Sequence, residues 1–234
     1  MSDIIYFLKD GQNEELRYSL RSVAKNFPHE RVIFYGGCPI GIQPDLHVPI
    51  EQNQPSKWQN VRMMIEQACA NDEISEDFWL FNDDFFVMRQ ITDLRPRHQG
   101  KIIDHINDVE TKHGSATPYT QLLRHQLETI KKFMNPDDAL DYALHMPMLI
   151  NRKKALTMLK AFPNEPMFRS LYGNHQKIGG IQVEDCKFGT IREPKNKDSE
   201  FLSTSDEAFI GHDIGEYIRQ QFTKPSRWEY GGQL

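Results

Sequence analysis

The chain has 234 residues, a mass of 27.4 kDa and a formal net charge of -5, so it can bury one sizeable core, and its charge disfavours a nucleic-acid-binding surface. Its three cysteines are far apart and form no CxxC pair, which favours reduced thiols over a disulfide framework. No apolar run reaches the roughly 18 residues needed to cross a bilayer, and no signal-peptide pattern opens the chain, so we expect a cytoplasmic protein without a transmembrane segment.

The N-terminal part predicts the opening of a Rossmann-like α/β sheet. An apolar strand at 3–8 is followed by a helical pattern at 14–27, which Asn13 caps, and then by a second strand at 31–35. Such a β-α-β unit has two parallel strands and a right-handed crossover. No GxGxxG motif follows the first strand, so the sequence lacks the dinucleotide-binding fingerprint.

A further helix is expected at 56–70, because Ser56 and Gln59 have the spacing of a capping box and apolar residues recur at helical intervals after them. Lys57 and Asn60 lie in its first turn. The free N–H groups of a helix N-terminus attract anions, so these two residues could bind the pyrophosphate of a ligand. The alternative, a solvated surface lysine, stays open.

The most informative stretch is 78–87, where the polar triplet Asn82-Asp83-Asp84 interrupts two aromatic, strand-like runs. Burying an ionised carboxylate without a partner is costly, and two adjacent carboxylates repel, so we expect a cation here. At a strand end the triplet can offer Asn82 and Asp84, or both aspartates if the chain bends, to hydrated Mg²⁺ or Mn²⁺ carrying phosphates. The alternative is a polar hairpin turn, because Asn and Asp are common turn residues.

The second half predicts more helices and one extended segment. We expect the polar segment at 95–118 to be an acceptor loop or lid, and 119–133 to be an amphipathic helix. His145 opens an apolar segment that Pro147 bars from a helix interior, and it is either a packed core residue or a catalytic group. Further expected elements are a helix start at 135–138, a short helix at 152–162, a strand at 181–185, a charged loop at 195–199, a last helix from 205 and a docked aromatic tail at 225–230.

Together these segments resemble the Stealth family of sugar-phosphate transferases, which includes capsular polysaccharide phosphotransferases. Residues 3–6 with 15–22 resemble its first two blocks, the triplet followed by two phenylalanines resembles its asparagine-aspartate-aspartate element, and 145–150 resembles its third block. The matches follow the family's order over the first two thirds of the chain. At 168–174 the chain has FRSLYGN where the family has an arginine-histidine-serine-glutamate-aspartate run.

The resemblance implies a GT-A-like nucleotide-sugar transferase fold with a mixed central sheet flanked by helices. It implies one domain over 1–234, with a helical acceptor-side portion around 119–175. The implied reaction is metal-dependent transfer of a hexose 1-phosphate from a nucleotide sugar, in the first place a UDP-sugar, to a hydroxyl acceptor in polysaccharide or glycoconjugate synthesis.

Site roles follow from the resemblance and from the patterns above. The expected metal ligands are Asp83 and Asp84, with Mg²⁺ or Mn²⁺ as the cofactor. The expected catalytic residues are His145, Arg169 and Asp84, with His145 as general base or as a hydrogen-bond partner of the transferred phosphate. The expected donor-binding residues are Arg17, Arg21, Lys57, Asn60, Asn82 and Asn174.

Two alternatives stay open. The same scaffold can run an ordinary glycosyltransferase reaction, in which the acceptor attacks the anomeric carbon and a nucleoside diphosphate leaves. A protein of another class, a non-catalytic nucleotide- or carbohydrate-binding module, can also retain such a fold.

Overall fold

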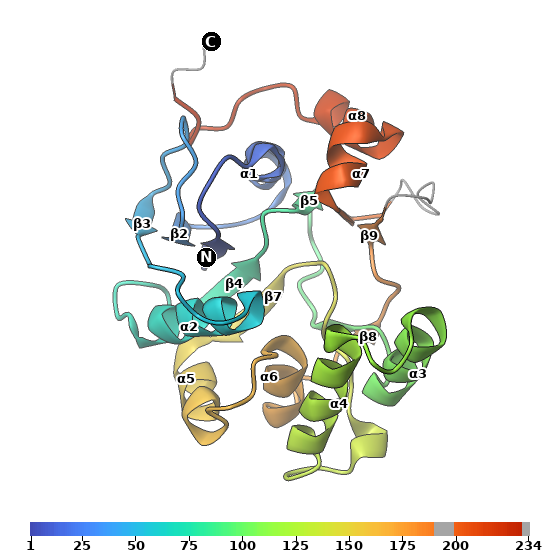
Figure 1. The fold of residues 1–234 in the computed structure, drawn as a ribbon. Coiled ribbons are helices and arrows are strands. Elements are labelled where there is room, and N and C mark those ends of the chain that lie inside the picture. Colours follow the sequence, from blue (N-terminus) through green and yellow to red (C-terminus); the bar gives the residue numbers. More distant parts are fainter. Residues whose placement is uncertain (190–198, 231–234) are drawn as a thin grey trace.

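A mixed five-stranded sheet lies at the centre of the computed structural model, which describes residues 1–189 and 199–230 (Figure 1). The strand order is β3-β2-β1-β4-β7, with β1 to β4 parallel and β7 antiparallel to β4. The strands are β1 (Asp3–Leu8), β2 (Val32–Gly36), β3 (Leu46–Val48), β4 (Asp77–Phe81) and β7 (Met148–Asn151). The charged loop expected at 195–199 lies, except for Ser199, outside the described residues.

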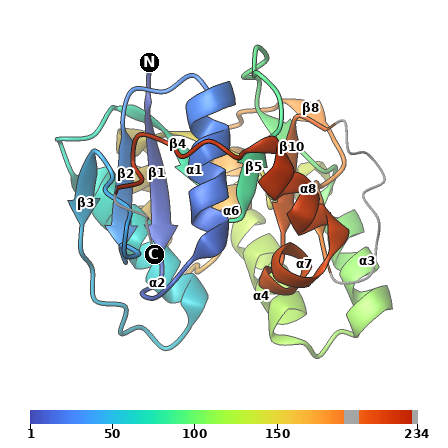
Figure 2. The same cartoon turned by 90° about the horizontal axis from the view of Figure 1, so that it is seen from above.

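Helices cover both faces of this sheet. Helix α1 (Glu14–Asn26) lies on one face and α2 (Lys57–Ala70) on the other (Figures 1 and 2). Neighbouring side chains of β1 point to opposite faces, so Ile4 and Tyr6 pack in the cluster around α1 while Ile5 packs in the cluster around α2. This two-sided burial explains why the predicted strands are continuous apolar runs.

The caps that the sequence predicts are present. Asn13 caps α1 by accepting a hydrogen bond from the Leu16 backbone N–H at 3.0 Å. Ser56 caps α2 by accepting one from the Gln59 N–H at 3.3 Å, and its hydroxyl also hydrogen-bonds to the Gln59 side chain at 2.8 Å. The N-termini of both helices are therefore fixed at the positions that the capping residues indicate.

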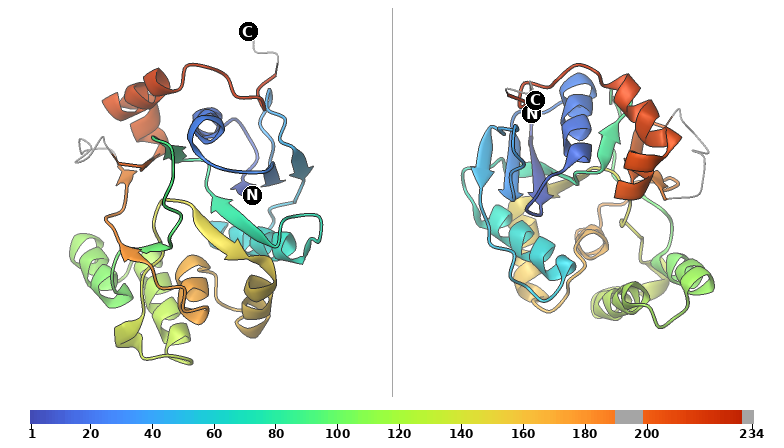
Figure 3. Two further views of the ribbon diagram at one scale, coloured as in Figure 1. Left: turned by 180° about the vertical axis from the view of Figure 1, so that it is seen from behind. Right: turned by 45° about the horizontal axis from the view of Figure 1, so that its top comes forward.

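Four further helices lie on the α2 side of the sheet and share its core cluster (Figures 1 and 3). They are α3 (Ile102–His113), α4 (Pro118–Ile130), α5 (Arg152–Ala161) and α6 (Arg169–His175), with a single 3-10 turn, η1 (Pro136–Asp138), between α4 and β7. Within 1–189 and 199–230, no helix is long and apolar enough to cross a membrane.

A small second sheet adjoins the central one. It has the order β5-β10-β9 and is formed by β5 (Phe85–Val87), β9 (Lys187–Phe188) and β10 (Phe201–Thr204). Helices α7 (Asp206–Gly211) and α8 (Asp213–Gln221) pack against it (Figure 2). Because the chain passes from β4 directly into β5, residues 82–84 lie at the junction between the two sheets.

The segment at 95–118 is not the loop that its polarity predicts. It contains the two-residue strand β6 (Arg97–His98), which pairs with β8 (Ile181–Gln182), and all of α3. Ile102, Ile106 and Val109 are buried and have helical spacing, but many charged residues separate them. Burial of this narrow apolar stripe against the core overrides the polar composition.

The last predicted helix is divided into α7 and α8 at His212. Gly215 lies so close to the end of α7 that a Cβ there would be 1.7 Å from the Phe209 carbonyl oxygen. The sharp turn between the two helices therefore depends on a residue without a side chain. The strand expected at 181–185 is likewise reduced to the two residues of β8.

The predicted docking of the aromatic tail is confirmed. The Trp228 side chain is only 2% exposed, and its indole N–H donates to Asp45 at 2.9 Å. Glu229 accepts two hydrogen bonds from Arg21, at 2.9 and 2.7 Å, and lies 3.6 Å from Arg17. Both arginines of α1 thus bind the tail.

Removing the Trp228 side chain should destabilise the fold. We expect Trp228→Ala to lower the free energy of unfolding by about 3 kcal/mol, since it leaves a large cavity between the tail and β2. Tyr230→Ala is the matched control, because Tyr230 is 58% exposed and its loss should cost no more than about 0.5 kcal/mol. Urea denaturation of both variants measures the difference, and equal midpoints would show that the tail is not docked.

Candidate active site

A cleft of about 1270 Å³ opens at the carboxyl ends of the parallel strands. Strands β1 and β4 supply the residues that follow them, Lys9 and the triplet 82–84. Tyr119 of α4 and Arg169 of α6 also line the cleft. In open α/β sheets ligands bind outside this strand edge, so the cleft is the candidate active site.

The triplet forms a turn at the floor of the cleft. The Asn82 carbonyl oxygen accepts a hydrogen bond from the Phe85 N–H at 3.3 Å, so the chain bends here. The flanking strands do not form a hairpin, since β5 pairs with β10 and not with β4. Asn82 is exposed, Asp83 is half-buried and Asp84 is buried, and all three line the cleft.

Asp84 has one carboxylate oxygen bound and one free. Its Oδ2 atom accepts hydrogen bonds from the Lys187 ammonium and the Ser203 hydroxyl, both at 2.8 Å. Its Oδ1 atom is buried and has no hydrogen-bond partner among the described residues. A buried carboxylate oxygen without a partner is costly, which makes it a candidate ligand for a cation.

Asp83 and Glu15 add negative charge on the same side of the cleft. Asp83 accepts a hydrogen bond from the Asn13 side-chain amide, and burial together with the charge of Asp84 raises its pKa. Burial also raises the pKa of Glu15 to about 8, with the charge of Asp84 adding to the shift, although Glu15 accepts a hydrogen bond from Thr204 at 2.6 Å. Glu15 is therefore mostly protonated at neutral pH.

The triplet suits a divalent cation that is only partly held by protein. Among residues 1–189 and 199–230, no group of three His, Cys, Asp or Glu side chains is arranged to hold a metal. Mg²⁺ commonly takes one or two carboxylates and completes its coordination with water and substrate phosphates. The free Asp84 oxygen and the neighbouring Asp83 carboxylate fit such a site.

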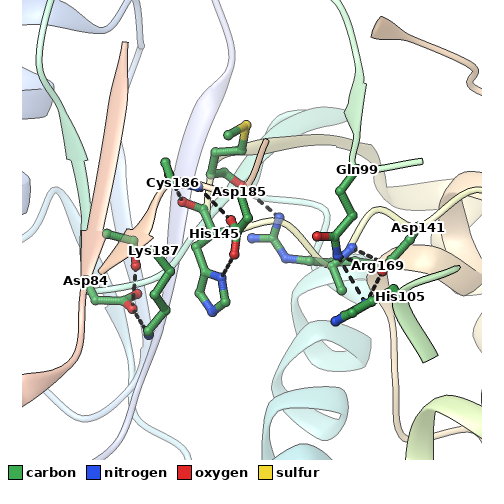
Figure 4. A network of polar contacts seen from close by, with 12 residues as sticks. Asp84, Gln99, His105, Asp141, His145, Arg169, Asp185, Cys186 and Lys187 are labelled. Carbon is green, nitrogen blue, oxygen red and sulfur yellow. Dashed lines mark hydrogen bonds and ion pairs between the residues drawn. The ribbon is translucent and has the colours of Figure 1, made fainter. Parts of the chain in front are cut away.

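His145 faces the cleft as half of a His–Asp pair. Its Nδ1 atom lies 2.7 Å from Asp185 Oδ2, and its backbone N–H donates to Asp185 Oδ1 at 2.8 Å (Figure 4). Burial raises the pKa of Asp185, but the hydrogen bonds from His145 outweigh it and keep that pKa below its usual value. An ionised Asp185 fixes the proton on Nδ1 and leaves Nε2 able to accept another.

Arg169 lies beside this pair. One guanidinium nitrogen donates to the Met146 carbonyl at 2.8 Å, and the group sits 5.4 Å from the centre of the Phe85 ring. The other terminal nitrogen, NH2, is buried without a hydrogen-bond partner among the described residues. Burial lowers the pKa of Arg169 to about 10, against the pull of Asp84 and Asp185, so it stays charged with unused donor capacity.

The remaining predicted donor-binding residues divide between the cleft and the scaffold. Lys57 and Asn60, at the start of α2, line the cleft. Asn174 is buried outside it, where its amide bonds to the Leu140 backbone and to the Ser170 carbonyl. Arg17 and Arg21 do not line the cleft. Both lie on α1 and form ion pairs with Glu229 of the C-terminal tail.

Three polar residues that bind the predicted ones or lie beside them, Glu15, Asp185 and Lys187, are among the cleft residues that the sequence-based predictions missed. Glu15 has the position of an ordinary acidic residue in a first helical turn, and the surrounding sequence does not indicate that its side chain is buried. Asp185 and Lys187 lie in a short charged segment whose partners, His145 and Asp84, are 40 and 103 positions away. Only long-range packing reveals these pairs.

Comparisons with known proteins bear on the fold. No family model and no curated protein matches the chain, so the resemblance to the Stealth family has no support from a family model. A solved structure of an active-site mutant of LgtC is similar with a TM-score of 0.50 and 12% identity, over 96% of this chain and 98% of that chain.

Two other solved structures score lower. A complex of the galactosyltransferase LgtC with donor and acceptor sugar analogues has a TM-score of 0.49 and 11% identity, over 95% of this chain and 96% of that chain. A glycosyltransferase involved in glycosylation of the major capsid of PBCV-1 has a TM-score of 0.36 and 12% identity, over 94% of this chain and all of that one (100%). The chain thus has a GT-A-like glycosyltransferase fold, and the predicted fold class is confirmed.

The raised pKa of Glu15 has a consequence for stability. The folded chain holds this proton up to about pH 8, whereas the unfolded chain releases it near the ordinary glutamate pKa of 4.5, so ionisation destabilises the fold across that interval. In metal-free buffer we expect the free energy of unfolding of Glu15→Gln to match that of the wild type near about pH 4 and to exceed it by on the order of 4 kcal/mol near about pH 8.5.

Urea midpoints at the two pH values measure this effect. Glu14→Gln is the control, because Glu14 is the exposed neighbour on the same helix turn and should show no such pH dependence. A constant difference between Glu15→Gln and the wild type at both pH values would contradict the assignment.

Proposed function

We propose that this chain is a transferase that uses a nucleotide-sugar donor and a hydroxyl acceptor, with the reaction in the cleft at the strand edge. The observation that carries the proposal is the presence, in one cleft, of a carboxylate with an unpartnered oxygen, Asp84, and of a His–Asp pair, His145 and Asp185. The GT-A-like fold supports it, since this scaffold is that of the LgtC enzyme.

The donor's pyrophosphate would lie between the triplet and the first turn of α2. Lys57, at that helix N-terminus, and Lys187, beside Asp84, line this part of the cleft. A helix N-terminus and two ammonium groups favour an anion there. Asp83 and Asp84 would hold Mg²⁺ or Mn²⁺, which when bound neutralises the charge of the phosphates.

His145 would act on the acceptor. Its Nε2 atom takes the proton of the acceptor hydroxyl as the oxygen attacks, while Asp185 holds the Nδ1 proton and stabilises the imidazolium that forms. The free Arg169 nitrogen lies near both Asp84 and Asp185 and can donate to a phosphate oxygen as its charge develops.

The transferred group is, in the first version of the proposal, a hexose 1-phosphate. The acceptor oxygen bonds to the β-phosphorus, the bond from that phosphorus to the bridging oxygen breaks, and a nucleoside monophosphate leaves. The residues that resemble the sugar-phosphate transferases favour this version, and several of them line the cleft, among them Asn82, Asp83, Asp84 and His145. The single domain with an acceptor side built from helices around 119–175 is part of the same proposal.

The second version is ordinary glycosyl transfer. Here the acceptor oxygen attacks the anomeric carbon and a nucleoside diphosphate leaves, with the same residues around the donor. The likeness of the fold to LgtC favours this version.

A product analysis separates the two versions. The protein is incubated with a panel of nucleotide sugars and Mn²⁺, and the nucleotides are separated by anion-exchange chromatography. UMP from a UDP-sugar supports phosphoryl transfer, and UDP supports glycosyl transfer. Donor binding without either product would overturn the proposal in favour of a non-catalytic binding module.

His145→Ala should nearly abolish turnover. A positioned general base contributes roughly 100- to 10,000-fold to rate, so we expect kcat to fall by that factor while donor affinity stays near that of the wild type. His113→Ala is the control, since His113 ends α3 on the exposed surface and does not line the cleft. Steady-state kinetics with calorimetric donor binding measures both quantities, and a change of only a few-fold in kcat would rule out the role.

Asp84→Asn should weaken the metal site. Mutating a residue that supports a metal ligand typically lowers metal affinity by roughly 10- to 100-fold. Asp84→Asn replaces a ligand itself, so we expect the affinity for Mn²⁺ in the presence of UDP to fall by more than that. Electron paramagnetic resonance of free Mn²⁺ measures this without any turnover. Asp137→Asn, on the exposed turn η1, is the control, and wild-type Mn²⁺ binding by Asp84→Asn would show that the triplet does not hold the metal.

A further inference from the structure

A second His–Asp pair lies beside the same cleft, with His105 lining it and Asp141 buried behind, and it has no part in the chemistry above. His105 of α3 contacts Asp141 through its Nδ1 atom, and the side chain of His105 is 19% exposed while that of Asp141 is 1% exposed. Figure 4 shows the imidazole with its second nitrogen turned away from Asp141. That nitrogen makes no hydrogen bond within the described part of the chain, so the cleft contains a second imidazole with a free N–H position.

Asp141 is held in its ionised form. Besides His105 it accepts hydrogen bonds from the Gln99 side chain at 2.6 Å, the Ser170 hydroxyl at 2.8 Å and the Ala143 N–H at 2.8 Å. Burial raises the pKa of Asp141, but the bond from His105 and these other donors outweigh it and lower that pKa overall. A permanent negative charge thus lies directly behind the imidazole ring.

This charge favours the protonated form of His105. Burial lowers the pKa of His105, but the hydrogen bond and charge of Asp141 outweigh it, and Asp185 and Asp108 add to the net rise. From α4, the Tyr119 ring faces the imidazole with its centre 6.2 Å away, and burial raises the pKa of Tyr119, so this neighbour stays neutral. The imidazolium therefore persists to higher pH than in an ordinary histidine.

The cleft that His105 lines has further unused hydrogen-bonding capacity. Gln126 of α4 donates through its amide nitrogen to the Met167 carbonyl at 2.9 Å, while its amide oxygen is buried without a partner among the described residues. Arg169, with its own unpartnered nitrogen, also lines the cleft. A buried polar atom without a partner lowers stability unless a ligand bonds to it.

We propose that the His105–Asp141 pair forms an acceptor subsite that binds an anionic substituent, a phosphate or a carboxylate, on the carbohydrate acceptor. The inference rests on the proposed transferase function and adds the chemical class of its acceptor. His105 donates from Nε2 to the anion, Asp141 keeps the imidazole charged, and Gln126 accepts from a nearby sugar hydroxyl. Binding of the anion should weaken as the pH rises through the pKa of His105, because only the imidazolium carries the charge.

A purely structural role for the pair makes a different prediction. Asp141 bonds to Gln99, to His105 and to Ser170 of α6, so it also joins three segments of the fold. A structural tie would affect stability but would not respond to a ligand. The test therefore needs a readout on His105 itself.

Nuclear magnetic resonance of the wild-type chain with ¹³C-labelled histidine gives this readout. Of the nine histidines, His105 is assigned from the signal that disappears in His105→Gln. The pKa of His105 is measured alone and with glucose 6-phosphate, glucuronate or glucose as probes. We expect one or both anions to raise it, with the stronger effect identifying phosphate or carboxylate, and glucose to leave it unchanged.

Three results would overturn the inference: no response of His105 to either anion, an equal response to glucose, or a response confined to His145. The exposed His113 on the same helix is the internal control and should not respond. Because the measurement needs no turnover, its failure differs from failure of the proposed function, which the nucleotide-product analysis tests separately.

Kinetics extends the test once a donor is known. We expect the wild type to use an acidic acceptor with a higher kcat/KM than the neutral counterpart of that acceptor. His105→Gln should lower the ratio of the two kcat/KM values, acidic to neutral, by about 10- to 100-fold, because it removes a charge-assisted hydrogen bond. His113→Gln should keep the wild-type ratio. An unchanged ratio in His105→Gln would exclude the subsite.

Discussion

The ion pair between Lys187 and Asp84 holds the candidate site together. It connects the turn after β4 to β9 of the small sheet, and Ser203 of β10 adds a second bond to the same carboxylate oxygen. Two residues before Lys187, Asp185 binds His145. Residues 185–187 therefore join the acidic floor of the cleft to its His–Asp pair, so the relative position of these two groups depends on one short segment.

This segment is further fixed by Cys186. Its thiol is buried and lies 3.0 Å from the His145 carbonyl oxygen, and its backbone N–H donates to Asp185 at 3.0 Å. Burial raises its pKa, so the thiol stays protonated and unreactive. Its contribution is positional, and the three cysteines are free thiols, as their spacing in the sequence predicts.

The local signals in the sequence were sufficient for β1, β2 and β4 of the central sheet and for α1 and α2, which flank it. Continuous apolar runs, Asn13, and the Ser56–Gln59 box act over a few residues, and the structure has each of them in place. The helix at 102–113 escaped prediction because only three buried apolar residues define it among charged neighbours. The break at His212 depends on the packing of Gly215 against Phe209, which no local pattern encodes.

Site residues were predictable only where the local sequence around them marks them as unusual. The triplet and His145 stand out because polar residues there interrupt apolar runs, and both lie in the cleft. Arg17 and Arg21 look identical in sequence to ligand-binding arginines, but Glu229, some 200 positions later, binds them. Asp185 and Lys187 could not be singled out for the same reason, since their partners are brought to them only by the completed fold.

Asn13 combines two tasks in one side chain. Its oxygen caps α1, and its amide nitrogen donates to Asp83 in the turn after β4. Serine, threonine and aspartate are good capping residues, but aspartate would place a third carboxylate beside Asp83, and the shorter hydroxyl residues lack the amide fork that serves both partners. Substitution at this position therefore alters the capping of a helix end and the electrostatics of the acidic floor together.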